Sequence, residues 1–233
     1  MEIAVYGDSF ADARNIFYTE NDFSWTNCLR KKGYNVTNYG KCASSLFYSY
    51  RQFIDTHEKF DKIIFLLTGR GRFEVQGLPE NDSSITYGMI DDLMNNREGF
   101  NSTQKEIVNA CLSYYKYVLD DKKEELFHNL LVKEIQRIRP DGLYIPCFPN
   151  CYQGQEEKNI IDLDYFSLFD HTYFNIKPSG PDDRRYCHMN EGNNQMLADR
   201  IDQWLHTNQF SLTKEDAVNP IVQNPEYYFT ISS

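Results

Sequence analysis

The chain has 233 residues, which is enough for one domain with a full hydrophobic core and rather short for two. Its formal net charge is −10, from 34 acidic and 24 basic residues, so nucleic acid is not an expected partner. The six cysteines lack paired CxxC spacing, and no apolar run approaches the ~20 residues of a membrane span. Neither a disulfide scaffold, a metal centre nor a membrane partner is therefore expected.

The first part of the chain alternates apolar stretches with a helical pattern. Residues 2–6 predict a buried strand. A helix is predicted next, with Asn21 or Asp22 as its N-cap and Gly33 at its end. The apolar positions of this helix are Phe23, Trp25, Cys28 and Leu29. Residues 34–40 predict a second strand that ends in a glycine.

A second helix and a third strand follow in the same order. Residues 44–60 predict a helix, and its apolar face is expected to consist of Leu46, Phe47, Tyr50, Phe53 and Ile54. Residues 62–69 (KIIFLLTG) contain an apolar run of the kind that is buried on both faces of a parallel sheet. Residues 70–102 are polar, rich in Gly and Asn, and show no sustained period. They are therefore predicted to be a long excursion, which usually has a function or is mobile.

The second half continues the alternation. Residues 103–138 predict a helical block that Pro140 ends, and the buried stripe of its second half is predicted to be Leu126, Leu130, Ile135 and Ile138. Residues 141–148 predict a fourth strand. Residues 190–205 predict a closing amphipathic helix, with the inward positions Met196, Leu197, Ile201, Trp204 and Leu205. The tail from about 206 to 233 is expected to wrap the domain or to contact a neighbour, as in a homo-oligomer.

Alternating strands and helices predict an α/β fold, a three-layer α/β/α sandwich with a mainly parallel sheet. We expect a single domain over residues 1–205, with an insertion at about 70–135, followed by the tail at 206–233. The chain opens with neither a basic start nor an apolar leader segment, so a cytoplasmic location is expected.

Ligands in open α/β sheets gather at the carboxyl ends of the strands. Three predicted strands end in residues that suit chemistry there: Ser9 after the first, Gly40 after the second, and Thr68 to Arg70 after the third. A hydroxyl, a glycine and a polar cluster are thus expected at one edge of the sheet. His188 lies in the loop just before the last predicted helix, within DDRRYCHMNEGNN.

This order of blocks resembles the SGNH or GDSL hydrolase family, whose nucleophilic serine lies in an N-terminal Gly-Asp-Ser block and whose base histidine lies near the C-terminus. The resemblance covers about residues 3–205 and implies a flavodoxin-like fold and an ester hydrolase. YGDSF implies Ser9 as the nucleophile, and CHMNEGNN implies His188 as the base. NYGKCASS implies that the Gly40 amide joins the Ser9 amide in an oxyanion hole. The implied substrate is a small-molecule or carbohydrate ester, and no metal or organic cofactor is needed.

Two positions depart from the family pattern. LLTGRGRF has Arg70 where the third block of the family carries an asparagine, and Arg185 stands where an aspartate usually precedes the histidine by three residues. A guanidinium can stabilise an oxyanion or bind an acidic substrate group. Arg70 is therefore predicted in the oxyanion hole and, with Arg72 and Arg185, in substrate binding. Asp183, or its neighbour Asp182, is predicted to orient the imidazole, with a backbone carbonyl as the alternative.

Other interpretations of these residues stay open. The Gly-Asp-Ser triplet alone fits a plain strand-to-helix turn with Asp8 or Ser9 as an N-cap. His171 is the substitute base if His188 has only a structural role, and the arginines fit solvated surface charges equally well. Because the usual Asn and Asp are missing, the second function considered is a binding or structural module that kept the hydrolase fold and lost activity.

Overall fold

The centre of the molecule is a sheet of four parallel strands in the order β2-β1-β3-β6. These strands are β1 (Glu2–Tyr6), β2 (Asn35–Asn38), β3 (Lys62–Leu67) and β6 (Leu143–Pro146). All four predicted strands are confirmed, the last three with shorter bounds than the predicted ranges. The computed structural model describes residues 1–12, 24–78, 84–85, 99–147, 189 and 191–212.

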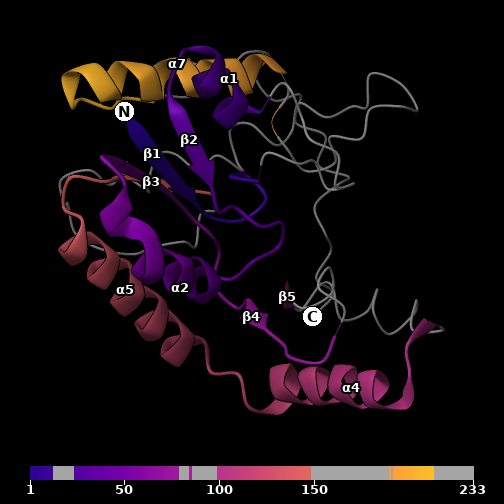
Figure 1. The fold of residues 1–233 in the computed structure, drawn as a ribbon. Helices are drawn as coiled ribbons and strands as arrows, with labels where there is room; N and C mark the ends of the chain where they lie inside the picture. The colour runs from indigo at the N-terminus through magenta and orange to yellow at the C-terminus, as the bar shows by residue number, and fades with distance from the viewer. Residues whose placement is uncertain (13–23, 79–83, 86–98, 148–188, 190, 213–233) are drawn as a thin grey trace, which may run out of the picture.

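Helices cover both faces of this sheet (Figure 1). On one face α1 (Trp25–Lys31) lies beside α7 (Glu191–Thr207), and on the other α2 (Leu46–Thr56) lies beside α5 (Asp121–Ile138). A short 3-10 turn, η1 (His57–Lys59), connects α2 to β3. Each of residues 63–67 in β3 is 0% exposed, because the strand is covered on both sides. The predicted three-layer α/β/α sandwich with a parallel sheet is thus confirmed.

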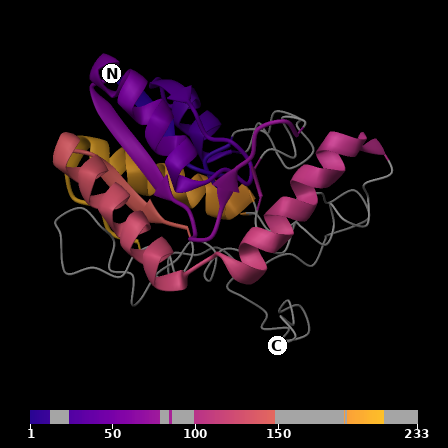
Figure 2. The same ribbon diagram turned by 90° about the horizontal axis from the view of Figure 1, so that it is seen from below.

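A second, smaller hydrophobic cluster lies beside the sandwich. It is built from the antiparallel pair β4 (Phe73–Glu74) and β5 (Ser84–Ile85) and from α4 (Ser102–Tyr117). α4 begins with a capping box, in which the side chains of Asn101 and Gln104 each accept a hydrogen bond from the main chain of the other. The buried residues of this cluster are Ile85, Val108, Cys111 and Tyr115. Figure 2 shows α4 apart from the sheet and separate from α5.

The predicted helical block at 103–138 is helical, but it divides into α4 and α5 at residues 118–120. Its predicted buried stripe is wrong at two positions, because Leu126 and Leu130 are 62% and 55% exposed. Ile135 is buried as predicted, and Ile138 packs partly against the core. The residues that α5 buries are His128, Leu131, Val132, Ile135 and Gln136. These recur every three or four residues on the side opposite to the two exposed leucines.

α1 and α7 bury the apolar residues predicted for them. In α1 these are Trp25, Cys28 and Leu29, and in α7 they are Leu197, Ile201, Trp204 and Leu205, with Met196 half-buried. The helix cap is different, since α1 begins after Ser24, whose hydroxyl accepts a hydrogen bond from the Asn27 amide at 3.3 Å. The prediction of Asn21 or Asp22 as the N-cap is therefore wrong, and Phe23 lies outside the described residues.

α2 presents only part of its predicted apolar face to the core. Leu46 and Phe53 are buried, but Phe47 and Ile54 are 44% and 41% exposed. The ring of Phe47 lies beside that of Phe127 in α5, with 6.2 Å between the ring centroids. Phe47 therefore lies against the neighbouring helix, whereas Leu46 and Phe53 pack into the core.

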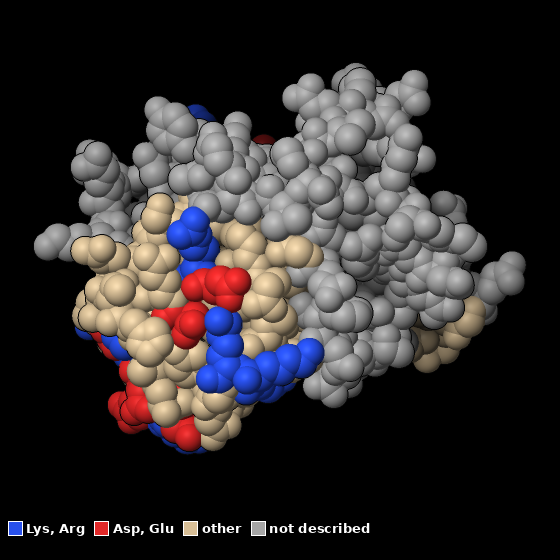
Figure 3. Space-filling view, turned by 90° about the horizontal axis from the view of Figure 1, so that it is seen from above, with Lys and Arg blue, Asp and Glu red and all other residues tan. Residues whose placement is uncertain are grey.

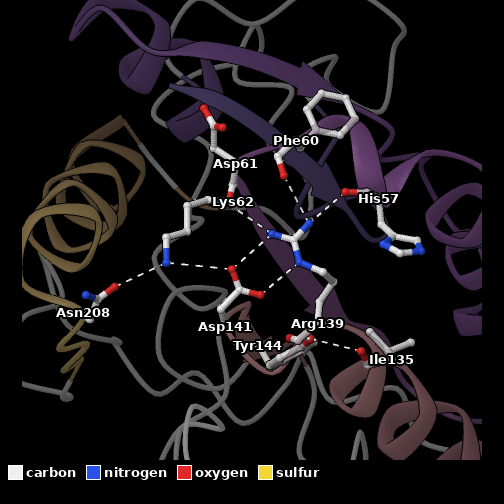
Figure 4. A network of polar contacts seen from close by, with 9 residues as sticks. All are labelled: His57, Phe60, Asp61, Lys62, Ile135, Arg139, Asp141, Tyr144 and Asn208. Atoms are coloured by element: carbon white, nitrogen blue, oxygen red, sulfur yellow. Dashed lines mark hydrogen bonds and ion pairs between the residues drawn. The ribbon is translucent and has the colours of Figure 1, made fainter.

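Arg139 joins the elements at the amino-terminal edge of the sheet (Figure 4). Its guanidinium donates hydrogen bonds to three main-chain carbonyls, those of His57, Phe60 and Asp61, at 2.8, 3.2 and 3.1 Å. It also donates to both carboxylate oxygens of Asp141, at 2.9 and 3.1 Å, and these hydrogen bonds lower the pKa of Asp141 below its usual value. The network fixes the starts of β3 and β6, at the edge opposite to the strands' carboxyl ends.

The outer face of α1 and α7 carries charges of both signs close together (Figure 3). Lys32 lies 2.9 Å from a carboxylate oxygen of Asp199 and 3.1 Å from one of Asp202. A hydrogen bond from the Tyr34 hydroxyl is the main cause that lowers the pKa of Asp202.

In the described ranges, no helix has both the length and the apolar composition needed to cross a membrane.

Candidate active site

β1 and β3 are neighbours in the sheet. The strand that follows β1 in this sheet, β2, lies on one side of the pair, and the strand that follows β3, β6, lies on the other. Open α/β sheets bind ligands at such a switch point, outside the carboxyl ends of the strands. The structure places Asp8 and Ser9 directly after β1, and Thr68, Arg70 and Arg72 directly after β3. Ser9 and both arginines therefore belong to loops that start at the switch point.

Two glycines let the chain approach itself closely around the switch point. Gly7 has a φ of +147°, and a Cβ on it would lie 2.7 Å from the Cβ of Leu66, so only glycine fits there. A Cβ on Gly40 would lie 2.7 Å from main-chain atoms of Ala11 and Asp12. Gly40 thus allows the loop after β2 to touch the turn after β1.

The turn that presents Ser9 is held by Asp8. The Asp8 carboxylate accepts a hydrogen bond from the Phe10 amide at 3.1 Å, and the Asp8 carbonyl accepts from the amides of Ala11 and Asp12, each at 3.0 Å. Ser9 itself is half-buried, and within the described part of the chain neither its hydroxyl nor its amide has a hydrogen-bond partner. Asp8 therefore caps the turn and leaves the polar groups of Ser9 available.

The Asp8 carboxylate is fully buried and lies in a cluster of polar groups from β3. Its Oδ2 accepts a hydrogen bond from the Thr68 hydroxyl at 2.6 Å and an ion-paired one from Arg72 Nη1 at 3.0 Å. A buried charge is tolerated when it is paired and hydrogen-bonded in this way. Arg72, which we predicted in substrate binding, is thus engaged by the residue that precedes Ser9.

The Gly40 amide, predicted as an oxyanion-hole donor, makes a hydrogen bond within the protein. It donates to Asn38 Oδ1 at 2.8 Å, and Asn38 Nδ2 donates to the Ala11 carbonyl at 2.6 Å. The next amide, that of Lys41, donates to the Gly7 carbonyl at 3.1 Å. An oxyanion at Gly40 would therefore share this amide with Asn38 or displace its side chain.

Arg70 points to a different neighbour than Arg72 does. Its Nη1 lies 2.9 Å from a carboxylate oxygen of Glu125 in α5, and its side chain is 21% exposed. The main chain beside it is also held, because the Tyr115 hydroxyl of α4 donates to the Gly71 carbonyl at 2.5 Å. Burial raises the pKa of Tyr115 well above its usual value, so this hydroxyl stays a donor at any physiological pH. The loop after β3 is thus attached to both α4 and α5.

The remaining predicted site residues lie outside the described residues: Asp182, Asp183, Arg185, His188 and the substitute base His171. The residue that follows His188 is described. Met189 is buried, and its carbonyl accepts a hydrogen bond from Asn194 Nδ2 at 3.0 Å. Asn194 Oδ1 accepts in turn from the Trp25 amide at 2.9 Å, which ties the start of α7 to that of α1. The roles predicted for the five undescribed residues stay predictions.

Two features of the site were not predicted from the sequence, namely the Asp8–Arg72 pair and the contacts of Asn38. The first has a signal in the sequence, since a carboxylate that directly follows a buried strand needs a partner. The second has none, because Asn38 acts through main-chain atoms of Gly40 and Ala11 that carry no side-chain signature.

The fold and this site define a class of protein, a parallel α/β domain with a serine-bearing turn at its switch point. No protein-family model matches the chain, and no curated protein matches its sequence.

Several solved structures are similar to it over most of both chains. The psychrotrophic esterase EstA from Pseudoalteromonas sp. is 14% identical, with a TM-score of 0.43, and the alignment covers 88% of this chain and 98% of that one. A protein assigned to the G-D-S-L family of lipolytic proteins, from Desulfitobacterium hafniense DCB-2, is 13% identical, with a TM-score of 0.34 and coverage of 87% and 98%. A carbohydrate acetylesterase family member from Sinorhizobium meliloti is 12% identical, with a TM-score of 0.35 and coverage of 88% and 97%.

Proposed function

We propose that the chain is a serine ester hydrolase that transfers an acyl group to water. The observation that carries this proposal is the position of Ser9, half-buried in a fixed turn at the switch point of the sheet. Its hydroxyl and amide have no hydrogen-bond partner in the described ranges, so both are free to meet a substrate. A hydroxyl presented by a rigid turn suits a nucleophile, provided that a base lies within reach.

In the proposed reaction His188 accepts the proton of Ser9 while the hydroxyl oxygen attacks the ester carbonyl. The amides of Ser9 and Gly40 and the guanidinium of Arg70 stabilise the oxyanion that forms. The alcohol leaves with the proton from His188, and water then hydrolyses the acyl-enzyme by the same route. Asp183 orients the imidazole. This sequence of steps needs no metal or organic cofactor.

Two contacts in the structure bear on this mechanism and favour a second candidate function. The Gly40 amide is bonded to Asn38, and Arg70 is paired with Glu125, so an oxyanion has to compete with both acceptors. A chain in which this competition is lost would be a binding or structural module that keeps the fold without the activity.

Hydrolysis of a short-chain aryl acetate and labelling by a fluorophosphonate separate these two functions. We expect the purified protein to hydrolyse the ester and to be labelled at Ser9, as peptide mapping by mass spectrometry would show. A folded protein that neither hydrolyses the ester nor reacts with the probe would support the binding module instead.

The substrate is proposed to be a small-molecule or carbohydrate ester, with Arg70 and Arg185 as binding residues. Arg70→Ala is expected to lower kcat/KM about tenfold more for an ester that bears a carboxylate than for a neutral aryl acetate, because only the first loses a charged contact as well as an oxyanion donor. Glu125→Gln is expected to raise kcat/KM for the ester that bears a carboxylate, because it removes the carboxylate that competes for Arg70.

Kinetics on this matched pair of esters decide the role of Arg70. Equal losses on both esters would limit Arg70 to the oxyanion. No loss on either would make it a surface charge that serves only its ion pair with Glu125.

A further inference from the structure

Arg72 connects the loops that follow three neighbouring strands. From the loop after β3, its Nη1 lies 3.0 Å from Asp8 Oδ2 in the turn after β1. The same nitrogen lies 3.5 Å from the carbonyl of Ser44, in the segment between β2 and α2. The Ser44 hydroxyl donates to the Gly7 carbonyl at 3.1 Å, which closes the connection back to β1. These contacts surround the residue that immediately precedes Ser9.

The charge of Asp8 makes this arrangement important for the proposed chemistry. Its side chain is 0% exposed, so water does not screen it. A carboxylate one residue before the nucleophile repels the negative charge that develops on the substrate oxygen, and this repulsion is strong where the local dielectric constant is low. The guanidinium of Arg72, itself only 14% exposed, offsets that field at its source.

The two arginines of this loop have different surroundings. Arg70 pairs with Glu125, whose side chain is 37% exposed and so remains open to exchange with solvent or an anionic ligand. Arg72 pairs with a carboxylate that has no contact with solvent, and breaking such a pair leaves an uncompensated buried charge. Arg72 is therefore poorly suited to exchange Asp8 for a substrate group.

We propose that Arg72 is a positioning residue, which neutralises Asp8 and so holds the Ser9 turn ready for an anionic transition state, in place of the substrate contact expected from the sequence. This inference rests on the proposed hydrolase function.

Variants at Asp8 and Arg72 separate the charge from the hydrogen bond. Arg72→Gln keeps a donor but loses the charge, and we expect kcat for an aryl acetate to fall about 10²-fold with KM nearly unchanged. Arg72→Lys keeps the charge and is expected to retain kcat within about tenfold of the parent. Asp8→Asn removes the repelling carboxylate and keeps an amide oxygen that can accept from the Phe10 amide, so its kcat is expected to stay within about tenfold of the parent.

The double variant Asp8→Asn/Arg72→Gln carries neither charge, and we expect its kcat to exceed that of Arg72→Gln by about tenfold. As a matched control, Glu134→Gln/Arg137→Gln removes an ion pair on α5 whose arginine side chain is 71% exposed. This control is expected to change neither kcat nor KM.

The inference is overturned if Arg72→Gln raises KM and leaves kcat unchanged, and if the double variant shows no recovery. Arg72 would then be assigned to substrate binding. Thermal unfolding of the same variants gives a readout independent of activity. Losses of stability that are not additive in the double variant support the Asp8–Arg72 pair. A double variant that folds where a single variant does not fold supports it as well. Additive losses overturn the pair. A parent protein that hydrolyses no ester refutes the proposed function and with it the catalytic role of Arg72, whereas the unfolding cycle still decides whether Arg72 and Asp8 stabilise each other.

Discussion

Ser9→Ala is expected to abolish hydrolysis of an aryl acetate, with a loss in kcat of about 10⁴-fold or more, while the melting temperature stays nearly unchanged. In the proposed mechanism the Ser9 oxygen forms the bond to the acyl group, and a methyl group cannot replace it. Stability is expected to be spared because Ser9 is only half-buried and its hydroxyl has no hydrogen-bond partner among the residues that the structure describes. The same variant is expected to lose labelling by a fluorophosphonate.

Ser113→Ala provides the matched control for this prediction. Ser113 is exposed on α4, where its hydroxyl donates to the Asn109 carbonyl at 3.0 Å. Hydrolysis, labelling and melting temperature are all expected to equal those of the parent. If the Ser9→Ala variant kept activity within a few-fold of the parent, the nucleophile would have to be another residue.

The central sheet could be predicted from the sequence because three of its four strands, β1, β3 and β6, are short apolar runs. Residues 63–67 carry five consecutive apolar side chains, and a run of that kind is stable only where both faces of a strand are covered. The alternation of such runs with helical patterns then leaves few topologies, and the parallel order β2-β1-β3-β6 is one of them.

Helix faces were harder to predict, as α5 shows. Its sequence has apolar residues on two sides, with Leu126 and Leu130 on one and Leu131, Val132 and Ile135 on the other. Spacing alone fits both sides equally well. The side that is buried depends on what α5 packs against, including α2, which lies far from α5 in the sequence.

The candidate site could be predicted as a set of strand ends, but not as a set of partners. Parallel strands bring their carboxyl ends to one edge, so Ser9 and the arginines after β3 were expected near each other. Which arginine meets which carboxylate depends on contacts between distant positions, such as Arg72 with Asp8, which are 64 residues apart. Two arginines separated by a single glycine have the same local pattern, although their neighbours differ.

His188→Ala is expected to lower kcat for an aryl acetate by several powers of ten, because Ser9 then loses the group that accepts its proton. The loss is expected to approach that of Ser9→Ala, since two residues that act as a unit give similar losses when either is removed. Combining the two substitutions is therefore expected to add little to either. An additive loss in the double variant would show that the two residues act independently.

The carboxylate behind His188 is expected to contribute less than in a complete triad, because Arg185 occupies the position three residues before the histidine. Asp183→Asn and Asp182→Asn are each expected to lower kcat by only about tenfold. The reason is that such a carboxylate orients the base and takes no part in making or breaking bonds. His171→Ala serves as the comparison among histidines, and its kcat is expected to equal that of the parent. A loss at either aspartate as deep as that at His188 would reveal a full triad with unusual spacing, and a deeper loss at His171 than at His188 would identify His171 as the base.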